Sequence, residues 1–223
     1  MSTTSLPLLE ELNELSARFE AAPAGSAVRW AHDRFGSGLV IAGSFQDAVL
    51  IDIAERVAPG IEVVFLDTQY HFAETLWFVE EVRRRYDLNL RVVHPLVDPD
   101  NLWQTDVEGC CGARKVEPLA RALSGREAWI TGLRRVDAPT RANAPAVSWD
   151  LARSMVKINP LASWTDADMA GYIADHDLPV NPLTERGYPS VGCWPCTRPV
   201  APGGDPRSGR WAGEDKTECG LHA

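Results

Sequence analysis

Five cysteines are the residues whose type and spacing suggest chemistry. Cys110 and Cys111 are adjacent, and Cys193 and Cys196 form a C-x-x-C pair in a region rich in Gly and Pro. Two close pairs of thiols are typical of a metal site, and a C-x-x-C in such a region is not a packing motif. Cys219 stands alone in the stretch EDKTECGLHA, where its neighbours look unable to bury it. A reactive thiolate needs exposure and nearby positive charge, so Cys219 requires a separate explanation.

The spacing within each cysteine pair bears on which metal the site would hold. Structural zinc sites usually build each half from a C-x₂₋₄-C knuckle, and adjacent cysteines have difficulty placing both sulfurs on one tetrahedral ion. A 4Fe–4S cube presents separate irons, so two neighbouring thiolates can each bind their own. Spacing therefore favours an iron–sulfur cluster over zinc. A thioredoxin-type role for CWPC is disfavoured because the motif lies late in the chain and not at the start of a βαβ unit.

The hydrophobic pattern predicts an α/β protein that positions these residues. Helical spacing covers residues 5–35, and apolar strands then alternate with amphipathic helices. This order implies a parallel twisted sheet flanked by helices, which binds ligands at the carboxyl ends of its strands. The predicted strands are 38–43, 61–67, 89–95 and 128–133. The predicted segments are an N-terminal helical segment (1–36), a nucleotide-binding α/β domain (37–180), and an irregular Gly/Pro-rich lobe with a mobile tail (181–223).

Composition and charge exclude several classes of function. The net charge of −9 argues against general nucleic-acid binding, which needs a basic face. The longest apolar runs are too short to span a bilayer. The N-terminus lacks a basic leader followed by an apolar block, so we expect a cytoplasmic protein. Local basic clusters in GARK, GLRR, APTR and DPRSGR remain compatible with a small anionic ligand.

Three motifs carry a resemblance to a known family. CCGARKVEPL, GCWPCTRP and the terminal ECGLH, supported by FLDTQYHFAET, ITGLRR and PTR, resemble the assimilatory adenylyl-sulfate (APS) reductases, the iron–sulfur-containing members of the APS/PAPS reductase family. The likeness runs from about residue 38 to residue 222. It implies an adenine-nucleotide α-hydrolase-like fold and an oxidoreductase of sulfate assimilation and cysteine biosynthesis. Such an enzyme reduces adenosine 5′-phosphosulfate to sulfite and AMP with electrons from thioredoxin.

The resemblance also implies roles for individual residues. The ligands of a 4Fe–4S cluster map onto Cys110, Cys111, Cys193 and Cys196, and the nucleophile maps onto Cys219. The implied substrate contacts are Ser44, Leu66 through its backbone, Lys115, Gly132, Arg141, Arg207, Arg210 and His222.

The sequence departs from the family pattern in two places. The loop after the first strand, GSFQDAV, is shorter and poorer in Gly and Ser than is usual, which bears on Ser44 as a substrate contact. Gln69 and Ala73 stand where the family commonly shows Gly and Pro, near the expected adenosine site.

The chemistry of a phosphosulfate fits one cysteine on a mobile tail. AMP is a good leaving group, so a thiolate can attack the sulfur directly and form an S-sulfocysteine on Cys219. An external dithiol, thioredoxin or a thioredoxin-like protein, would then release sulfite and resolve the mixed disulfide. The tail could close over the nucleotide and swing out to meet this reductant.

Three alternatives remain open. A PAPS reductase has the same fold but generally lacks the two cysteine pairs. A tRNA-thiolating PP-loop ATP pyrophosphatase should show a Ser-Gly-Gly-x-Asp-Ser-type loop, which GSFQDA does not provide. A non-catalytic zinc-binding adaptor would contain zinc, and its Cys219 would be dispensable. The expected partners are the nucleotide and the reductant, without nucleic acid or membrane, and self-association into a homo-oligomer is left open.

Overall fold

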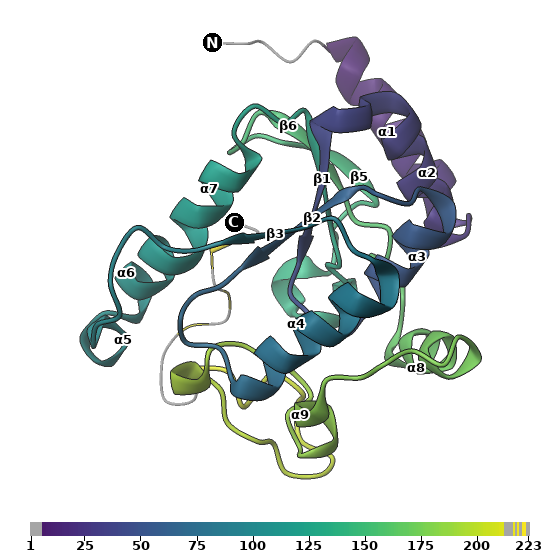
Figure 1. Cartoon of the computed structure of the whole chain (residues 1–223). Coiled ribbons are helices and arrows are strands. Elements are labelled where there is room, and N and C mark those ends of the chain that lie inside the picture. Colours follow the sequence, from purple (N-terminus) through teal and green to yellow (C-terminus); the bar gives the residue numbers. More distant parts are fainter. Residues whose placement is uncertain (1–5, 212–215, 217, 219, 222–223) are drawn as a thin grey trace. The chain divides into compact units, whose positions relative to one another are not determined.

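The computed structural model describes residues 6–211, 216, 218, 220 and 221 of the chain (Figure 1). Cys219 and His222, which the sequence predicts as nucleophile and substrate contact, lie outside the described residues. The remaining predicted site residues are all described.

Six strands form a mostly parallel sheet in the order β3-β2-β1-β4-β6-β5. The strands are β1 (Leu39–Gly43), β2 (Glu62–Leu66), β3 (Leu90–Val93), β4 (Ala128–Thr131), β5 (Val147–Asp150) and β6 (Met155–Ile158). β4 pairs in parallel with β1 and with β6, whereas the edge strand β5 runs antiparallel to β6. The central strands are nearly continuous apolar runs, as expected for a sheet covered on both faces. The predicted α/β class is confirmed.

Nine α-helices connect and flank these strands in the described part of the chain. They are α1 (Leu6–Glu20), α2 (Ala24–Phe35), α3 (Val49–Val57), α4 (Ala73–Tyr86), α5 (Leu102–Thr105), α6 (Val107–Cys111), α7 (Glu117–Leu123), α8 (Asp166–Asp175) and α9 (Pro182–Glu185). A π-helical turn, η2 (Gly112–Val116), joins α6 to α7. The stretch predicted as helical at residues 5–35 is two helices, because Pro23 precedes α2 and cannot continue α1.

The chain divides into two compact units, each built from separate segments. The first unit comprises Met1–Gly43, Val49–Val63 and Gly125–Leu178. The second unit comprises Ser44–Ala48, Val64–Ser124 and Pro179–Ala223. All four paired cysteines therefore belong to the second unit. The three predicted segments, 1–36, 37–180 and 181–223, stay a prediction.

The first unit buries its helices against strands of the sheet. α2 presents Ala27, Val28 and Ala31, which are at most 1% exposed, toward β1, β4 and β6. α8 begins with a capping box, which the spacing of Thr165 and Asp168 in the sequence predicts: the Thr165 hydroxyl accepts from the backbone N–H of Asp168 at 3.2 Å. The Asp168 carboxylate in turn accepts from the backbone N–H of Thr165, so both N-terminal donors are satisfied.

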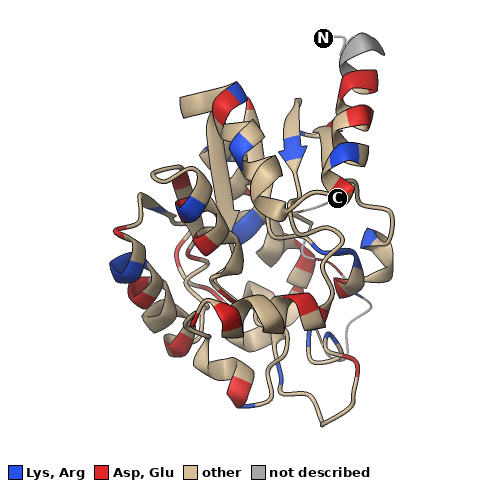
Figure 2. Ribbon diagram, turned by 90° about the vertical axis from the view of Figure 1, so that its right-hand side faces the viewer, with Lys and Arg blue, Asp and Glu red and all other residues tan. Residues whose placement is uncertain are grey.

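The surface carries acidic residues on most helices, with basic residues interspersed among them (Figure 2). This distribution agrees with the excess of 31 Asp and Glu over 22 Lys and Arg in the sequence. Among the described residues, the helices are too short or too polar to cross a bilayer.

A candidate site with four cysteines

The adjacent cysteines end a short helix of the second unit. The N-cap of α6 is Asp106, whose carboxylate accepts from the backbone N–H of Gly109 at 2.8 Å. Cys110 and Cys111 occupy its last positions, and both are 7% exposed. The π-turn η2 follows at once, and the backbone N–H of Glu117 donates to Gly112, five residues back. A π-turn inserts an extra residue into a helix and is frequent at functional sites.

The C-x-x-C pair is held by backbone hydrogen bonds in an irregular loop. Cys193 forms an isolated β-bridge with His71, and the N–H of Trp194 donates to the carbonyl of Tyr70 at 2.8 Å. The N–H of Cys196 donates to the carbonyl of Cys193 at 3.0 Å, which closes a tight turn between the two thiols. The carbonyl of Cys196 then accepts from the N–H of Trp211 at 2.9 Å. The backbone of the C-x-x-C pair is therefore held by main-chain groups from distant parts of the sequence.

All four paired cysteines line one pocket of the second unit. The pocket is also lined by Tyr70, Trp103, Arg114, Lys115 and Trp211, among others. Near this pocket the hydroxyl of Thr68 lies 3.2 Å from the sulfur of Cys193. The structure thus brings together the cysteines predicted as ligands, together with the predicted substrate contact Lys115.

Burial and the proximity of other thiols raise the pKa of two of these cysteines, Cys110 and Cys196. Burial raises the pKa of Cys110 to about 11, with further contributions from Cys111 and Cys193, while the positive charge of Arg114 opposes the rise. Burial also raises the pKa of Cys196, and Cys193 adds to the shift. Thiols in such surroundings ionise when a bound cation compensates their charge.

The donor set fits a metal group bound by thiolates. The four sulfurs share one pocket, and an all-thiol donor set is typical of zinc or iron–sulfur sites. Among the described residues, no three His, Cys, Asp or Glu side chains are arranged to hold one metal ion.

A buried arginine beside the cysteines is the main feature that the sequence analysis missed. The side chain of Arg114 is 2% exposed and forms an ion pair with Asp100 at 3.2 Å. Its guanidinium carbon lies 4.6 Å from the centre of the Tyr70 ring. Its place in GARK was a usable signal, because this basic cluster directly follows the cysteine pair, but a role was assigned to Lys115 alone.

Arg210, a predicted substrate contact, lies close to the C-x-x-C loop. Its Nη1 donates to the hydroxyl of Ser190 at 3.3 Å and to the carbonyl of Val191 at 3.2 Å. The guanidinium also packs on Trp211, which lines the cysteine pocket. Gly192 makes this approach feasible, because a Cβ there would overlap the guanidinium.

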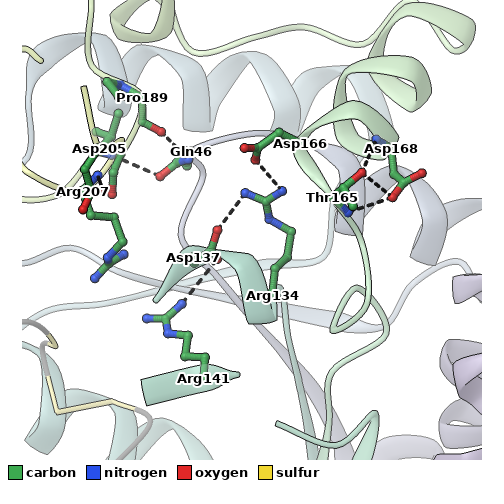
Figure 3. A network of polar contacts seen from close by, with 12 residues as sticks. Gln46, Arg134, Asp137, Arg141, Thr165, Asp166, Asp168, Pro189, Asp205 and Arg207 are labelled. Atoms are coloured by element: carbon green, nitrogen blue, oxygen red, sulfur yellow. Dashed lines mark hydrogen bonds and ion pairs between the residues drawn. The ribbon is translucent and has the colours of Figure 1, made fainter. Parts of the chain in front are cut away.

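Arg207, the second predicted arginine of this lobe, contacts the C-terminal segment. Its Nη2 lies 3.7 Å from a carboxylate oxygen of Glu218, the residue that precedes Cys219. Lys216 forms a second ion pair, with Glu108 of α6. The backbone N–H of Arg207 donates to Asp205 at 2.8 Å (Figure 3).

Ser44 directly follows β1, and Leu66 is the last residue of β2. Ser44 is exposed immediately after β1. The Leu66 carbonyl at the end of β2 accepts from Nε2 of His71 at 2.9 Å, and burial lowers the pKa of this histidine. The loop after β1 is fixed within the second unit, because the Gln46 side chain donates to the carbonyl of Pro189 at 3.1 Å (Figure 3).

Gly132 and Arg141, the remaining predicted substrate contacts, belong to the first unit. Gly132 is exposed directly after β4. Arg141 lies 3.4 Å from Asp137, which also accepts from Arg134 at 2.7 Å (Figure 3). Arg134 donates to Asp166 at 2.9 Å as well, so a network of alternating charges orders this loop.

A mostly parallel sheet with loops at the carboxyl ends of its strands is typical of α/β proteins that bind nucleotides. This chain has, in addition, a pocket lined by four cysteine thiols. The comparisons define the group further: the chain belongs to the phosphoadenosine phosphosulfate reductase domain family, whose model matches residues 38–199.

Curated relatives are similar to this chain over nearly their whole length. The adenosine 5′-phosphosulfate reductase of Mycolicibacterium smegmatis is 52% identical over 95% of each chain. The protein of the same name from Mycobacterium tuberculosis is 48% identical over 96% of this chain and 95% of the relative. The predicted family is thereby confirmed.

Solved structures agree on the fold. A phosphoadenylyl-sulfate (PAPS) reductase from Candida auris, in a phosphate complex, superimposes with a TM-score of 0.76 at 28% identity, covering 85% of this chain and 97% of that one. The FMN adenylyltransferase of Candida glabrata shares the fold alone, with a TM-score of 0.60 at 15% identity over 86% of this chain and 74% of that one.

Proposed function

We propose that the chain reduces adenosine 5′-phosphosulfate to sulfite and AMP in sulfate assimilation. One observation carries the proposal: the four paired cysteines line a single pocket with Lys115, in a chain 52% identical to an adenosine 5′-phosphosulfate reductase over 95% of both lengths. Similarity over nearly the whole length supports the same activity more strongly than the fold alone, which hosts several functions.

Cys110, Cys111, Cys193 and Cys196 would hold a 4Fe–4S cluster in this proposal. The shared pocket and the all-thiol donor set support it, and two adjacent thiolates can bind separate irons of a cluster more easily than one tetrahedral ion. When bound, the cluster would supply local electrostatic polarisation at the sulfate end of the substrate. The protein would contribute Arg114 and Lys115, whose positive charges both face the cysteine pocket.

The basic side chains of the second unit would bind the anionic end of the substrate. Lys115 lines the cysteine pocket, and Arg210 packs beside the C-x-x-C loop. Arg207 already faces a carboxylate, that of Glu218, which shows that its guanidinium can engage an anion. Guanidinium groups suit the oxygens of phosphate and sulfate geometrically. The roles of Ser44, Leu66, Gly132, Arg141 and His222 stay predictions.

Cys219 would act as the nucleophile. Its thiolate attacks the sulfur of the phosphosulfate, an S–S bond forms, the bond from sulfur to the bridging oxygen breaks, and AMP leaves with that electron pair. One thiolate of a dithiol protein such as thioredoxin then attacks the Cys219 sulfur and displaces sulfite. Its second thiol resolves the mixed disulfide, so the dithiol supplies both electrons. Free thiols of this kind require a reducing compartment, and we infer a cytoplasmic location.

PAPS reduction is the second candidate, favoured by the likeness to the Candida auris enzyme at a TM-score of 0.76. The two nucleotides differ only in a 3′-phosphate, so assays with each in parallel separate the candidates. Preference for the unphosphorylated nucleotide supports the proposal, and strict use of PAPS contradicts it.

Intact mass after anaerobic incubation with APS, without reductant, tests the proposed step. We expect a gain of one SO₃ group in the wild-type chain and none in Cys219→Ser. Iron and sulfide analysis of the same sample tests the cluster. Zinc in place of iron, with no adduct, would support a non-catalytic adaptor instead.

A further inference from the structure

We propose that Gln69 is a positioning residue whose side-chain amide fixes Arg114 against the four-cysteine pocket. The inference rests on the proposed metal group at those cysteines, and it concerns a residue for which neither the sequence motifs nor the chemistry of the cysteines supplied a role.

Arg114 is a buried cation that lines the pocket, and the two terminal nitrogens of its guanidinium have three partners, whereas Nε has none among the described residues. Nη1 donates to the amide oxygen of Gln69 at 2.5 Å. Nη2 donates to the carbonyl of Asp98 at 2.5 Å and lies 3.2 Å from a carboxylate oxygen of Asp100. Because Nη2 has both of the other partners, Gln69 is the hydrogen-bond partner that orients the Nη1 side of the guanidinium plane. The face of that plane lies over the ring of Tyr70.

The backbone at Gln69 is in a conformation that disfavours a side chain. Its φ is +67°, in the left-handed region where glycine alone carries no steric penalty. The turn is stabilised by the N–H of Gln69, which donates to the carboxylate of Asp67 at 2.9 Å. Gly would satisfy this turn without the steric cost that a side chain adds at a positive φ. The contact with Arg114 is therefore the gain that a glutamine brings to the position.

The absence of charge on the Gln69 side chain matters as much as its position. An amide oxygen orients the guanidinium without cancelling its charge, whereas a carboxylate would neutralise it. Asp100 carries a charge but is 42% exposed, so water screens it more than it screens the buried Arg114. Arg114 consequently keeps its positive charge where it lines the pocket beside the cysteines.

Three variants distinguish the loss of the contact with Arg114 from the relief of backbone strain at position 69. Gln69→Gly removes the amide and relaxes the turn, so it should fold at least as stably as the wild type. Gln69→Glu keeps the contact and neutralises the charge. Asp87→Gly is the matched control, because Asp87 also has a positive φ, +47°, and is not among the pocket-lining residues.

The first measurement needs no metal. Metal-free full-length chains are treated with phenylglyoxal, and modification of Arg114 is followed by peptide mass. We expect faster modification of Arg114 in Gln69→Gly, because loss of the amide leaves Nη1 without its partner and opens the pocket beside it, and a wild-type rate in Asp87→Gly. An unchanged rate in Gln69→Gly overturns the inference.

The second measurement uses the iron-reconstituted chains and follows loss of visible absorption in excess chelator. Gln69→Gly should lose iron about tenfold faster than the wild type, and Gln69→Glu should also shift the reduction potential of the metal group to more negative values. Faster modification of Arg114 with unchanged iron loss would contradict the inference that the contact between Gln69 and Arg114 influences metal retention in the pocket. A wild-type chain that takes up no iron would contradict the proposed cluster, while the phenylglyoxal rates still decide the contact between Gln69 and Arg114.

Discussion

The two cysteine pairs of the pocket are held in different ways. Cys110 and Cys111 sit at the end of a helix whose start is capped by Asp106, four residues upstream of Cys110, so their support is local in sequence. Cys193 and Cys196 sit in a loop supported by main chain from around residue 70 and from Trp211. The first pair therefore depends on helix formation, and the second on contacts between distant segments. Each kind of support can be broken separately.

The largest effect should come from the ligands themselves. Replacing one proposed ligand from each pair, Cys110→Ala and Cys193→Ala, should reduce bound iron to background in both variants, because a methyl group cannot bind iron in place of a thiolate. Iron and sulfide analysis of the purified chains is the measurement. If either alanine variant retained full iron, that pair would not belong to the metal site.

Crowding the loop that holds the second pair should have the next largest effect. In Gly192→Ala the added Cβ would overlap the Arg210 guanidinium, so this side chain would have to move and lose its hydrogen bonds to Ser190 and Val191, each worth about 0.5–1.5 kcal/mol. Urea unfolding of the metal-free chain measures the loss, and iron retention should fall with it. Gly171→Ala is the control, because the space around Gly171 in α8 is open and alanine favours a helix. Equal stability of Gly192→Ala and the wild type would contradict the close packing of Arg210.

Removing the cap of the first pair should have a smaller effect. Asp106→Ala deletes the acceptor for the Gly109 N–H and should cost about 1 kcal/mol, whereas Asp106→Asn should preserve most of the cap. Unfolding by urea gives the free-energy difference, and chelator challenge gives the rate of iron loss. Thr165→Ala, which removes the cap of α8, should cost a similar amount without changing iron loss. Equal effects of both variants on iron would show that the cap of α6 does not position the cysteines.

The smallest effect concerns the ion pair between Lys216 and Glu108. Glu108 is 80% exposed, and pairs at such positions contribute little to stability. Glu108→Gln should therefore leave urea unfolding unchanged. Any effect on turnover should vanish at high salt, where screening removes the attraction in the wild type as well. A salt-independent loss of turnover would assign Glu108 another role.

The elements predicted from local patterns were largely correct. The predicted strands 38–43, 61–67, 89–95 and 128–133 agree with β1 to β4 to within two residues at each end. The Thr165 capping box was recognised from a three-residue spacing. β5 was missed, because a four-residue edge strand between turns has too little periodicity to stand out.

The missed parts of the site depend on contacts between residues far apart in sequence. Gln69 and Arg114 are separated by 45 positions, and Thr68 and Cys193 by 125. The cysteines could be grouped because their spacing has chemical meaning by itself. Nothing in LDTQY or GARK indicates that these two stretches meet, and a π-turn has no sequence signature comparable to a helix cap.

The interleaving of the two units has a consequence for how the protein is made. The second unit contains residues 44–48, 64–124 and 179–223, so its early segments must wait for the last one before they can complete their packing. On the ribosome, Cys110 and Cys111 would emerge well before Cys193 and Cys196 exist. Domains generally fold as whole units during synthesis. Loading of the proposed metal group would therefore follow translation, and until then the first pair of thiols would be open to oxidation or to capture by the wrong metal.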